Sequence, residues 1–143
     1  MLVDRIDTIA HAIQLAVTPV FLLTGVGAML SVMAARLARI IDRGRVLHDR
    51  YGKPGAVTAE IDEELAVITL RMRVVNTAIT LCTLCALLIC SVVAVIFLDT
   101  LTTTDIGTPI ASLFVGAMAC LIAALLAFLL EIYLATAKIK LRR

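Results

Sequence analysis

The segment 12–35, AIQLAVTPVFLLTGVGAMLSVMAA, is apolar and runs directly into the basic segment 36–45, RLARIIDRGR. No Asn-Gly pair or cluster of turn-forming residues separates the two segments. Helices are ended by such signals, so their absence predicts one helix that begins in lipid and ends in water.

The composition of the whole chain is that of a membrane protein. Of its 143 residues, 62% are hydrophobic and only 17% are charged, and the mean hydropathy is +1.06, which is far above that of a soluble domain. A hydrocarbon core of about 30 Å needs roughly 20 helical residues. Three stretches are long enough: 12–35, 74–98 and 110–130. The sequence therefore predicts an all-α membrane protein, with residues 1–143 forming a single domain of three transmembrane helices.

The basic residues are distributed very unevenly along the chain. Of the 13 Lys and Arg residues, eight lie between the first and second spans and four follow the third. The loop 99–109 has none. By the positive-inside rule, the N-terminus is expected outside and the C-terminus in the cytoplasm. Orientation accounts for the basic residues, so no nucleic-acid partner is expected.

The segment 36–73 is expected to form a cytoplasmic helical hairpin from extensions of the first two helices. After residue 35 the pattern becomes amphipathic, the segment 51–55 has turn composition, and Thr58 is a suitable N-cap for the second helix. The arginines on one face of the first extension are candidates for binding anionic lipids or a partner. They are Arg36, Arg39 and Arg43.

Four polar residues near the start of the chain recur at spacings of four, three and four, which places them on one helical face. They are Asp7, His11, Gln14 and Thr18. Polar groups in a span are costly unless they face protein or water. The stripe is therefore expected either to line a pore formed by several subunits or to hydrogen-bond to a neighbouring helix.

Small residues are expected to mark where the helices pack. They recur every four residues from Ala78 to Ala94 and from Ser112 to Ala124. Small side chains allow the close backbone approach on which helix association in lipid depends. The candidate packing positions are Gly25, Gly27, Ala86 and Gly116.

The four cysteines fall within the spans and are expected to pack as small apolar residues, with no metal or redox role.

Two polar residues lie near the predicted cytoplasmic boundary of the spans, Asn76 and Glu131. Both are expected to be buried. Arg71 and Arg73 lie near the same boundary, so either is a candidate partner for Glu131.

Several motifs together resemble a family of small bacterial and cyanobacterial membrane proteins known only as a domain of unknown function. They are I-A-x-A-I-Q-L-A-x-x-P-V-F-L-L-x-G-x-G at 9–27, R-L-A-R-I-x-D-R at 36–43, N-x-A-I at 76–79, L-F-V at 113–115 and F-L-x-E-I at 128–132, where x is any residue. Where the family pattern leads us to expect a basic residue before the last Glu, this chain has Leu130. The resemblance implies a bacterial inner-membrane location and no particular activity.

Two classes of function fit these patterns. The first is a homo-oligomeric channel or ion-conducting assembly, in which the polar stripe would contact water and ions. The second is a membrane-anchored scaffold or regulatory module that acts through its basic cytoplasmic hairpin. An enzyme is not expected, because the sequence has no nucleophile–base pair, phosphate-binding glycine loop or metal-ligand spacing. No cofactor is expected, and membrane lipids and further copies of the chain are the expected partners.

Overall fold

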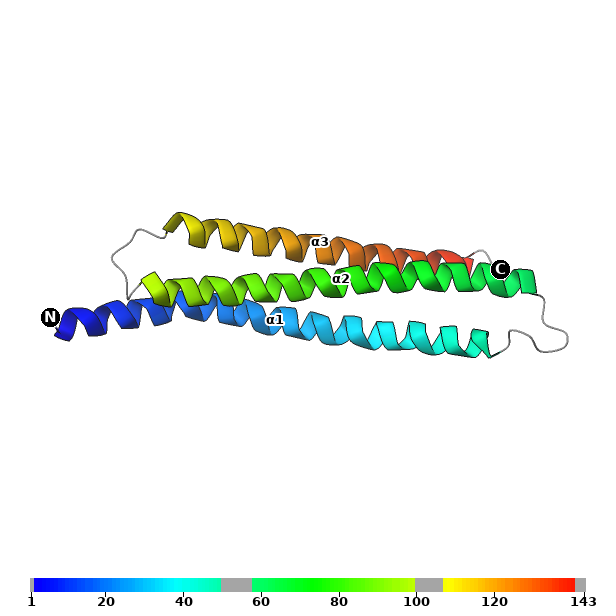
Figure 1. Ribbon diagram of the computed structural model, residues 1–143, viewed down its shortest axis with the longest axis horizontal. Helices are drawn as coiled ribbons and strands as arrows, with labels where there is room; N and C mark the ends of the chain where they lie inside the picture. The colour runs from blue at the N-terminus through cyan, green and yellow to red at the C-terminus, as the bar shows by residue number, and fades with distance from the viewer. Residues whose placement is uncertain (1, 50–57, 100–106, 141–143) are drawn as a thin grey trace. The chain divides into compact units, whose positions relative to one another are not determined.

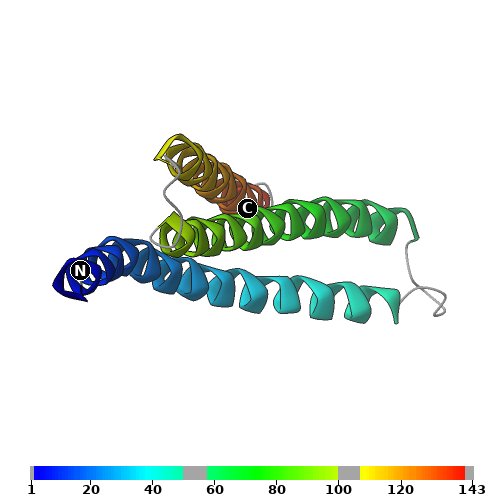
Figure 2. The ribbon, with the colours of Figure 1, turned by 60° about the vertical axis from the view of Figure 1, so that its left-hand side comes forward.

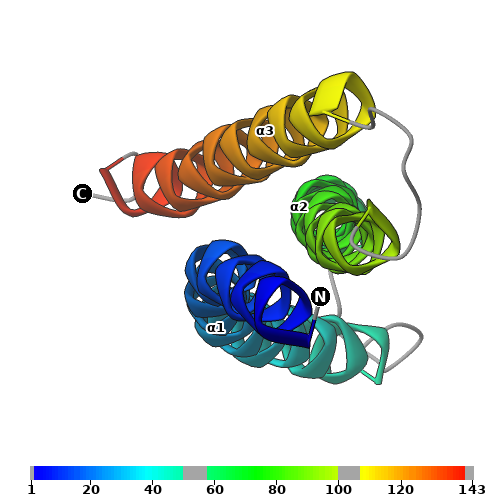
Figure 3. The ribbon, with the colours of Figure 1, turned by 90° about the vertical axis from the view of Figure 1, so that its left-hand side faces the viewer.

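The computed structural model describes residues 2–49, 58–99 and 107–140, with side chains for 9–11, 13–49, 61–98 and 107–136. These residues form three helices: α1 (Leu2–His48), α2 (Thr58–Asp99) and α3 (Gly107–Lys140). Each is a continuous helix (Figures 1 and 3), and α1 continues through Pro19. The predicted turn at 51–55 and most of the predicted outer loop lie outside the described residues.

Each helix contains a stretch that is long and apolar enough to cross a membrane. These stretches are Ile9–His48, Ile61–Leu98 and Gly107–Thr136. The prediction of an all-helical protein with three apolar helices is confirmed. Because α1 is continuous from residue 2 to residue 48, the apolar segment and the basic segment do belong to one helix.

The buried face of α2 follows alternating steps of three and four residues. Val75, Ala78, Cys82, Cys85, Ile89 and Val92 are all at most 2% exposed. This repeat averages 3.5 residues, as in coiled coils, so it stays on the side facing its neighbours. The predicted stripe with a strict step of four leaves this face towards its C-terminal end, where Ala86 is half-buried and Cys90 is exposed in the single chain. Packing of that part against another copy of the chain stays a prediction. A four-residue step rotates by about 40° beyond a full turn, so the stripe moves off the contact.

Seven-residue spacing also defines the buried faces of the other two helices. In α1, Val26, Met33, Ile40 and Leu47 are buried at every seventh position. In α3, Ala117, Ala124 and Glu131 are buried with the same spacing. A carboxylate therefore occupies a position that the repeat otherwise gives to alanine.

The chain divides into two compact units, each with segments from all three helices. The first comprises Met1–Met29 and Leu81–Ile122, and we call it the apolar unit. A Cβ atom on Gly25 or Gly27 would meet nothing within 4 Å, whereas one on Gly116 would lie 3.8 Å from Cδ1 of Leu88. Of the three predicted glycine packing positions, only Gly116 faces another helix within the chain.

The second unit comprises Leu30–Thr80 and Ala123–Arg143, and we call it the charged unit. In it, the end of α1 and the start of α2 lie side by side and antiparallel (Figure 2). Their contact contains a buried cluster of Ile40, Leu47, Ile68 and Val75. Gly44 allows close approach, because its Cβ position lies 3.6 Å from Cγ2 of Ile68. The predicted amphipathic pattern of this segment therefore corresponds to a real helix–helix contact.

Candidate functional site

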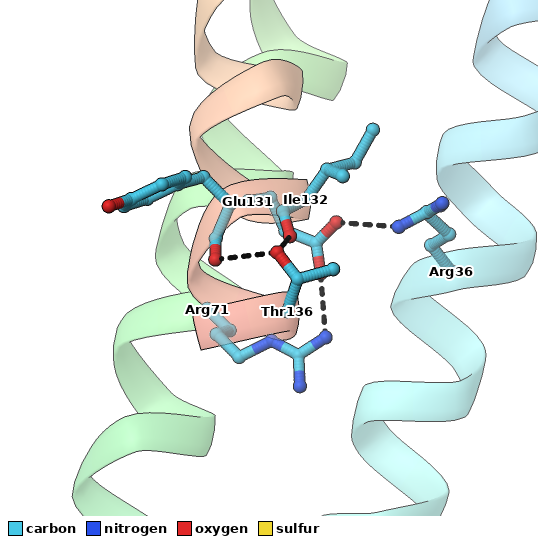
Figure 4. Close-up of polar contacts among 6 residues, drawn as sticks. Arg36, Arg71, Glu131, Ile132 and Thr136 are labelled. Atoms are coloured by element: carbon cyan, nitrogen blue, oxygen red, sulfur yellow. Dashed lines mark hydrogen bonds and ion pairs between the residues drawn. The ribbon is translucent and has the colours of Figure 1, made fainter. Parts of the chain in front are cut away.

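Glu131 is the centre of a charged cluster to which all three helices contribute (Figure 4). Its side chain is 1% exposed. Oε2 accepts a hydrogen bond from Nη1 of Arg36 on α1 at 3.0 Å, and Oε1 accepts one from Nη2 of Arg71 on α2 at 2.7 Å. One carboxylate on α3 thus bridges two guanidinium groups from the other helices.

The two arginines are held differently. The guanidinium carbon of Arg36 lies 5.1 Å from the centre of the Phe128 ring, within the range of a cation–π contact. Nε of Arg71 is buried and has no hydrogen-bond partner. The Arg36 and Arg71 side chains are 39% and 28% exposed, respectively. The site therefore contains a buried carboxylate and two guanidinium groups that are partly exposed at the protein surface.

The local sequence explains why the carboxylate points inwards. Glu131 follows Ala117 and Ala124 at intervals of seven, so it lies on the same buried face of α3. A buried carboxylate without counter-ions would be strongly unfavourable. Pairing with both arginines compensates this cost and connects the three helix segments of the charged unit.

A second ion pair joins the end of α1 to the start of α2. Nε and Nη2 of Arg43 donate to Oε1 of Glu64 at 3.2 and 2.7 Å. Both side chains are about half exposed, at 50% and 41%. Exposed pairs contribute at most about 1 kcal/mol. Removing one partner of this pair is therefore expected to cost less than removing Glu131 from its cluster.

A pocket of about 240 Å³ opens beside Glu131. Its lining contains four arginines and a single carboxylate, with two isoleucines completing the wall. The lining residues are Arg36, Arg39, Ile40, Arg43, Ile68, Arg71 and Glu131. We call it the arginine pocket. The three arginines predicted to bind anionic lipid or a partner all line it, together with Arg71.

The polar stripe of α1 is not part of this site. His11, Gln14 and Thr18 are exposed on the surface of the single chain, and the side chain of Asp7 lies outside the described residues. None of these three side chains is buried against a neighbouring helix within the single chain. The alternative prediction, that the stripe hydrogen-bonds to a neighbouring helix, is therefore not met within the chain.

The predictions for the inner boundary hold in part. Glu131 is buried and contacts Arg71, one of its two candidate partners, whereas Arg73 is exposed. The expected burial of Asn76 is wrong for the single chain, because that residue is exposed. It lies one position beyond the buried Val75 and therefore off the 3-4 repeat of α2.

Sequence reasoning missed the pairing of Arg36 with Glu131. The two residues are 95 positions apart, and no local pattern links them. The spacing of Ala117, Ala124 and Glu131 was the available signal for the direction of the carboxylate. Leu130 is 50% exposed, so a basic residue at that position would not have been needed, since Glu131 finds its cations on other helices.

Within the described parts of the chain, no group of three or more His, Cys, Asp or Glu side chains could hold a metal ion. The cysteines there, Cys82, Cys85, Cys90 and Cys120, form no disulfide bond with one another.

Three long apolar helices and a carboxylate shared between two arginines define a helical membrane protein with a charged cluster in one of its two units. A family profile described as a protein of unknown function, DUF2721, matches residues 16–141. The chain therefore belongs to the DUF2721 family, in agreement with the resemblance seen in the sequence. No curated protein and no solved structure is significantly similar to it.

Proposed function

We propose that this protein is a non-catalytic, membrane-anchored module of the bacterial inner membrane that acts through the basic hairpin, residues 36–73. In this proposal, the N-terminus is outside and both the hairpin and the C-terminus are in the cytoplasm. The excess of Lys and Arg in and after the hairpin supports this orientation.

The bridging of Arg36 and Arg71 by Glu131 is the observation that carries the proposal. The two arginines lie at the two ends of the hairpin segment, where it joins the apolar spans. Fixing both ends to α3 holds the hairpin in one register, while the apolar cluster around Ile40 and Ile68 holds its two helices together. A preorganised surface of this kind binds a partner with less loss of conformational entropy.

The hairpin also exposes apolar side chains outside the predicted spans. Val46 is 45% exposed and Leu70 is 51% exposed. These two side chains are accessible positions at which contact of the hairpin with a partner can be tested.

Photo-crosslinking in growing bacterial cells tests the proposal. A photoreactive amino acid replaces Val46 or Leu70 in the full chain, and matched controls replace Val115 or Ile122, which are 67% and 59% exposed on α3. We expect discrete protein adducts from the two hairpin positions and none from the two span positions. Equal labelling patterns at all four positions would contradict a role for the hairpin.

Orientation is tested separately by thiol labelling. Asp42 and Thr108 are both exposed, one on the hairpin and one at the start of α3. A membrane-impermeant maleimide added to intact spheroplasts should label Thr108→Cys and leave Asp42→Cys unlabelled, with the unsubstituted protein as the background. The reverse pattern would place the hairpin outside.

A homo-oligomeric, ion-conducting assembly is a second candidate, supported by the exposure of His11, Gln14 and Thr18. His11 precedes Arg36 by about 25 residues, or roughly 38 Å of helix. In the proposed orientation, His11 would lie near the outer headgroups, with Gln14 and Thr18 one and two turns deeper. A polar stripe at this depth is unfavourable in lipid and is stabilised by water or by a second copy.

The mass of the detergent-solubilised particle and planar-bilayer recording test this candidate together. We expect a multimer whose conductance falls in His11→Ala and Asp7→Asn. We also expect a smaller particle for Gly25→Leu, because the open space around Gly25 in the single chain is where a second copy could pack and leucine would block it. A monomeric particle without conductance would exclude the assembly and would leave the hairpin proposal intact.

A further inference from the structure

The arginine pocket has more positive charge than its own acids neutralise. Four guanidinium groups and one carboxylate line it. Glu64, which pairs with Arg43 from outside the lining, brings the acids to two. The balance around the pocket is therefore about two positive charges, and an anion is the complementary ligand.

The donors in the pocket are only partly used. Arg36 and Arg71 each direct one terminal nitrogen to Glu131, and Nε of Arg71 is buried without a partner. Among the described residues, Arg39 makes no ion pair. Arginine carries five N–H donors in a fixed fork that suits phosphate oxygens. The pocket thus combines unused donors with a side chain, Arg71, that is already held in place.

The size and position of the pocket restrict the ligand. A volume of about 240 Å³ corresponds to roughly eight water molecules, which is ample for a tetrahedral oxyanion. The predicted first span ends at residue 35 and the second begins at residue 74, so Arg36 and Arg71 lie at the edge of the apolar region. This is the level at which phosphate groups of lipids are found, and basic pockets between helices there bind anionic headgroups.

Exposed apolar side chains within one helical turn of Arg36 and Glu131 along the sequence suit a lipid as the source of that phosphate. Within the charged unit, Val32, Leu129 and Leu130 are each at least half exposed just on the apolar side of the cluster. A lipid with its phosphate between the arginines would lay its acyl chains along these residues.

We propose that the arginine pocket is a binding site for one phosphate group, held by Arg39, Arg43 and Arg71 while Arg36 remains paired with Glu131. The inference rests on the proposed role of the basic hairpin and names the chemistry of its ligand. Two sources share this chemistry, the headgroup of an anionic phospholipid and free phosphate, and the experiment separates them.

The test titrates the full-length protein, purified in a neutral detergent, with dioleoylphosphatidylglycerol and, separately, with dioleoylphosphatidylcholine. Native mass spectrometry measures the fraction of protein with one bound lipid. Arg39→Gln removes one pocket charge without touching the Glu131 cluster. Arg45→Gln is the matched control, because Arg45 is an exposed arginine on the same helix that does not line this pocket.

We expect saturable binding of one phosphatidylglycerol, about fivefold weaker in Arg39→Gln and unchanged in Arg45→Gln. The affinity of the wild type for phosphatidylcholine should be no higher than the affinity of Arg39→Gln for phosphatidylglycerol. Displacement of the lipid by millimolar inorganic phosphate would support the phosphate site and identify free phosphate as a competing ligand. If phosphate does not displace the lipid and lipid binding still depends on Arg39, the result supports the site and identifies the lipid headgroup as the source of the bound phosphate group.

Two results would overturn the proposal. One is no saturable binding of phosphatidylglycerol together with no stabilisation of the protein by phosphate. The other is an equal loss of binding in Arg39→Gln and Arg45→Gln, which would show a diffuse surface attraction. If either result is obtained and the hairpin still forms crosslinks, the phosphate site is rejected and the proposed function stands. If the hairpin forms no crosslinks but the pocket still binds the lipid, the proposed function alone is rejected.

Discussion

The charged unit and the apolar unit are built on the same 3-4 repeat but fill it with different chemistry. In the apolar unit the buried positions of α2 are Cys82, Cys85, Ile89 and Val92. In the charged unit the repeat includes the fully buried Glu131, paired with arginines from two helices. Small apolar residues permit close packing and specify little, whereas a buried charge tolerates only the arrangement that pairs it. We therefore expect the Glu131 cluster to set the register of the helices, and the following predictions test this expectation.

Removing the shared carboxylate should have the largest effect. Glu131→Ala leaves Arg36 and Arg71 facing each other without their counter-ion, and we expect a loss of about 3 kcal/mol in the free energy of unfolding. SDS titration of the protein in mixed micelles, followed by circular dichroism, measures this loss. The control is Glu63→Ala at an exposed position of α2. A loss no larger than that of the control would show that the cluster does not hold the unit together.

The same apolar substitution in the two units should give different results. Ile68 is 7% exposed in the hairpin core and Ile89 is fully buried in the predicted second span. In water, Ile→Ala loses both packing and the hydrophobic transfer energy, or about 2–3 kcal/mol. In lipid the transfer term largely disappears, so we expect about 1 kcal/mol for Ile89→Ala. The same SDS titration compares the variants, and equal losses would place both residues in the same solvent.

The exposed ion pair should contribute little. A double-mutant cycle of Arg43→Gln and Glu64→Gln is expected to give a coupling of about 0.5 kcal/mol that disappears at high salt, because both partners are about half exposed. The corresponding cycle of Arg71→Gln and Glu131→Gln should retain most of its coupling under the same conditions. A salt-insensitive Arg43–Glu64 coupling would show that the hairpin is more deeply buried than it is in the single chain.

Replacing the whole cluster should leave the free energy of unfolding almost unchanged. The triple variant Arg36→Met, Arg71→Met, Glu131→Leu is expected to lie within about 1 kcal/mol of the wild type, because apolar residues of similar size can replace a buried ionic group. Limited proteolysis should then cleave the hairpin faster, since its register is less well specified. A triple variant as unstable as Glu131→Ala would mean that the charges themselves supply the stability.

Sequence reasoning could reach the membrane class and the three apolar helices because these depend on composition and on the length of uninterrupted apolar runs, which are local properties. It also identified Arg36, Arg39 and Arg43 as one group, since they recur on a single helical face. It did not find the period of the face of α2 that is buried within the chain, because steps of three and four cannot be told from steps of four in a sequence rich in small residues.

The sequence by itself determined that this chain forms three long helices suited to lipid and that its positive charge collects at one end of them. Only the tertiary structure decided which carboxylate meets which arginine. Glu131 and Arg36 are on different helices 95 residues apart, and their pairing depends on how two seven-residue repeats align when the helices pack. That alignment is a property of the packed helices and is not encoded in the local pattern of either helix.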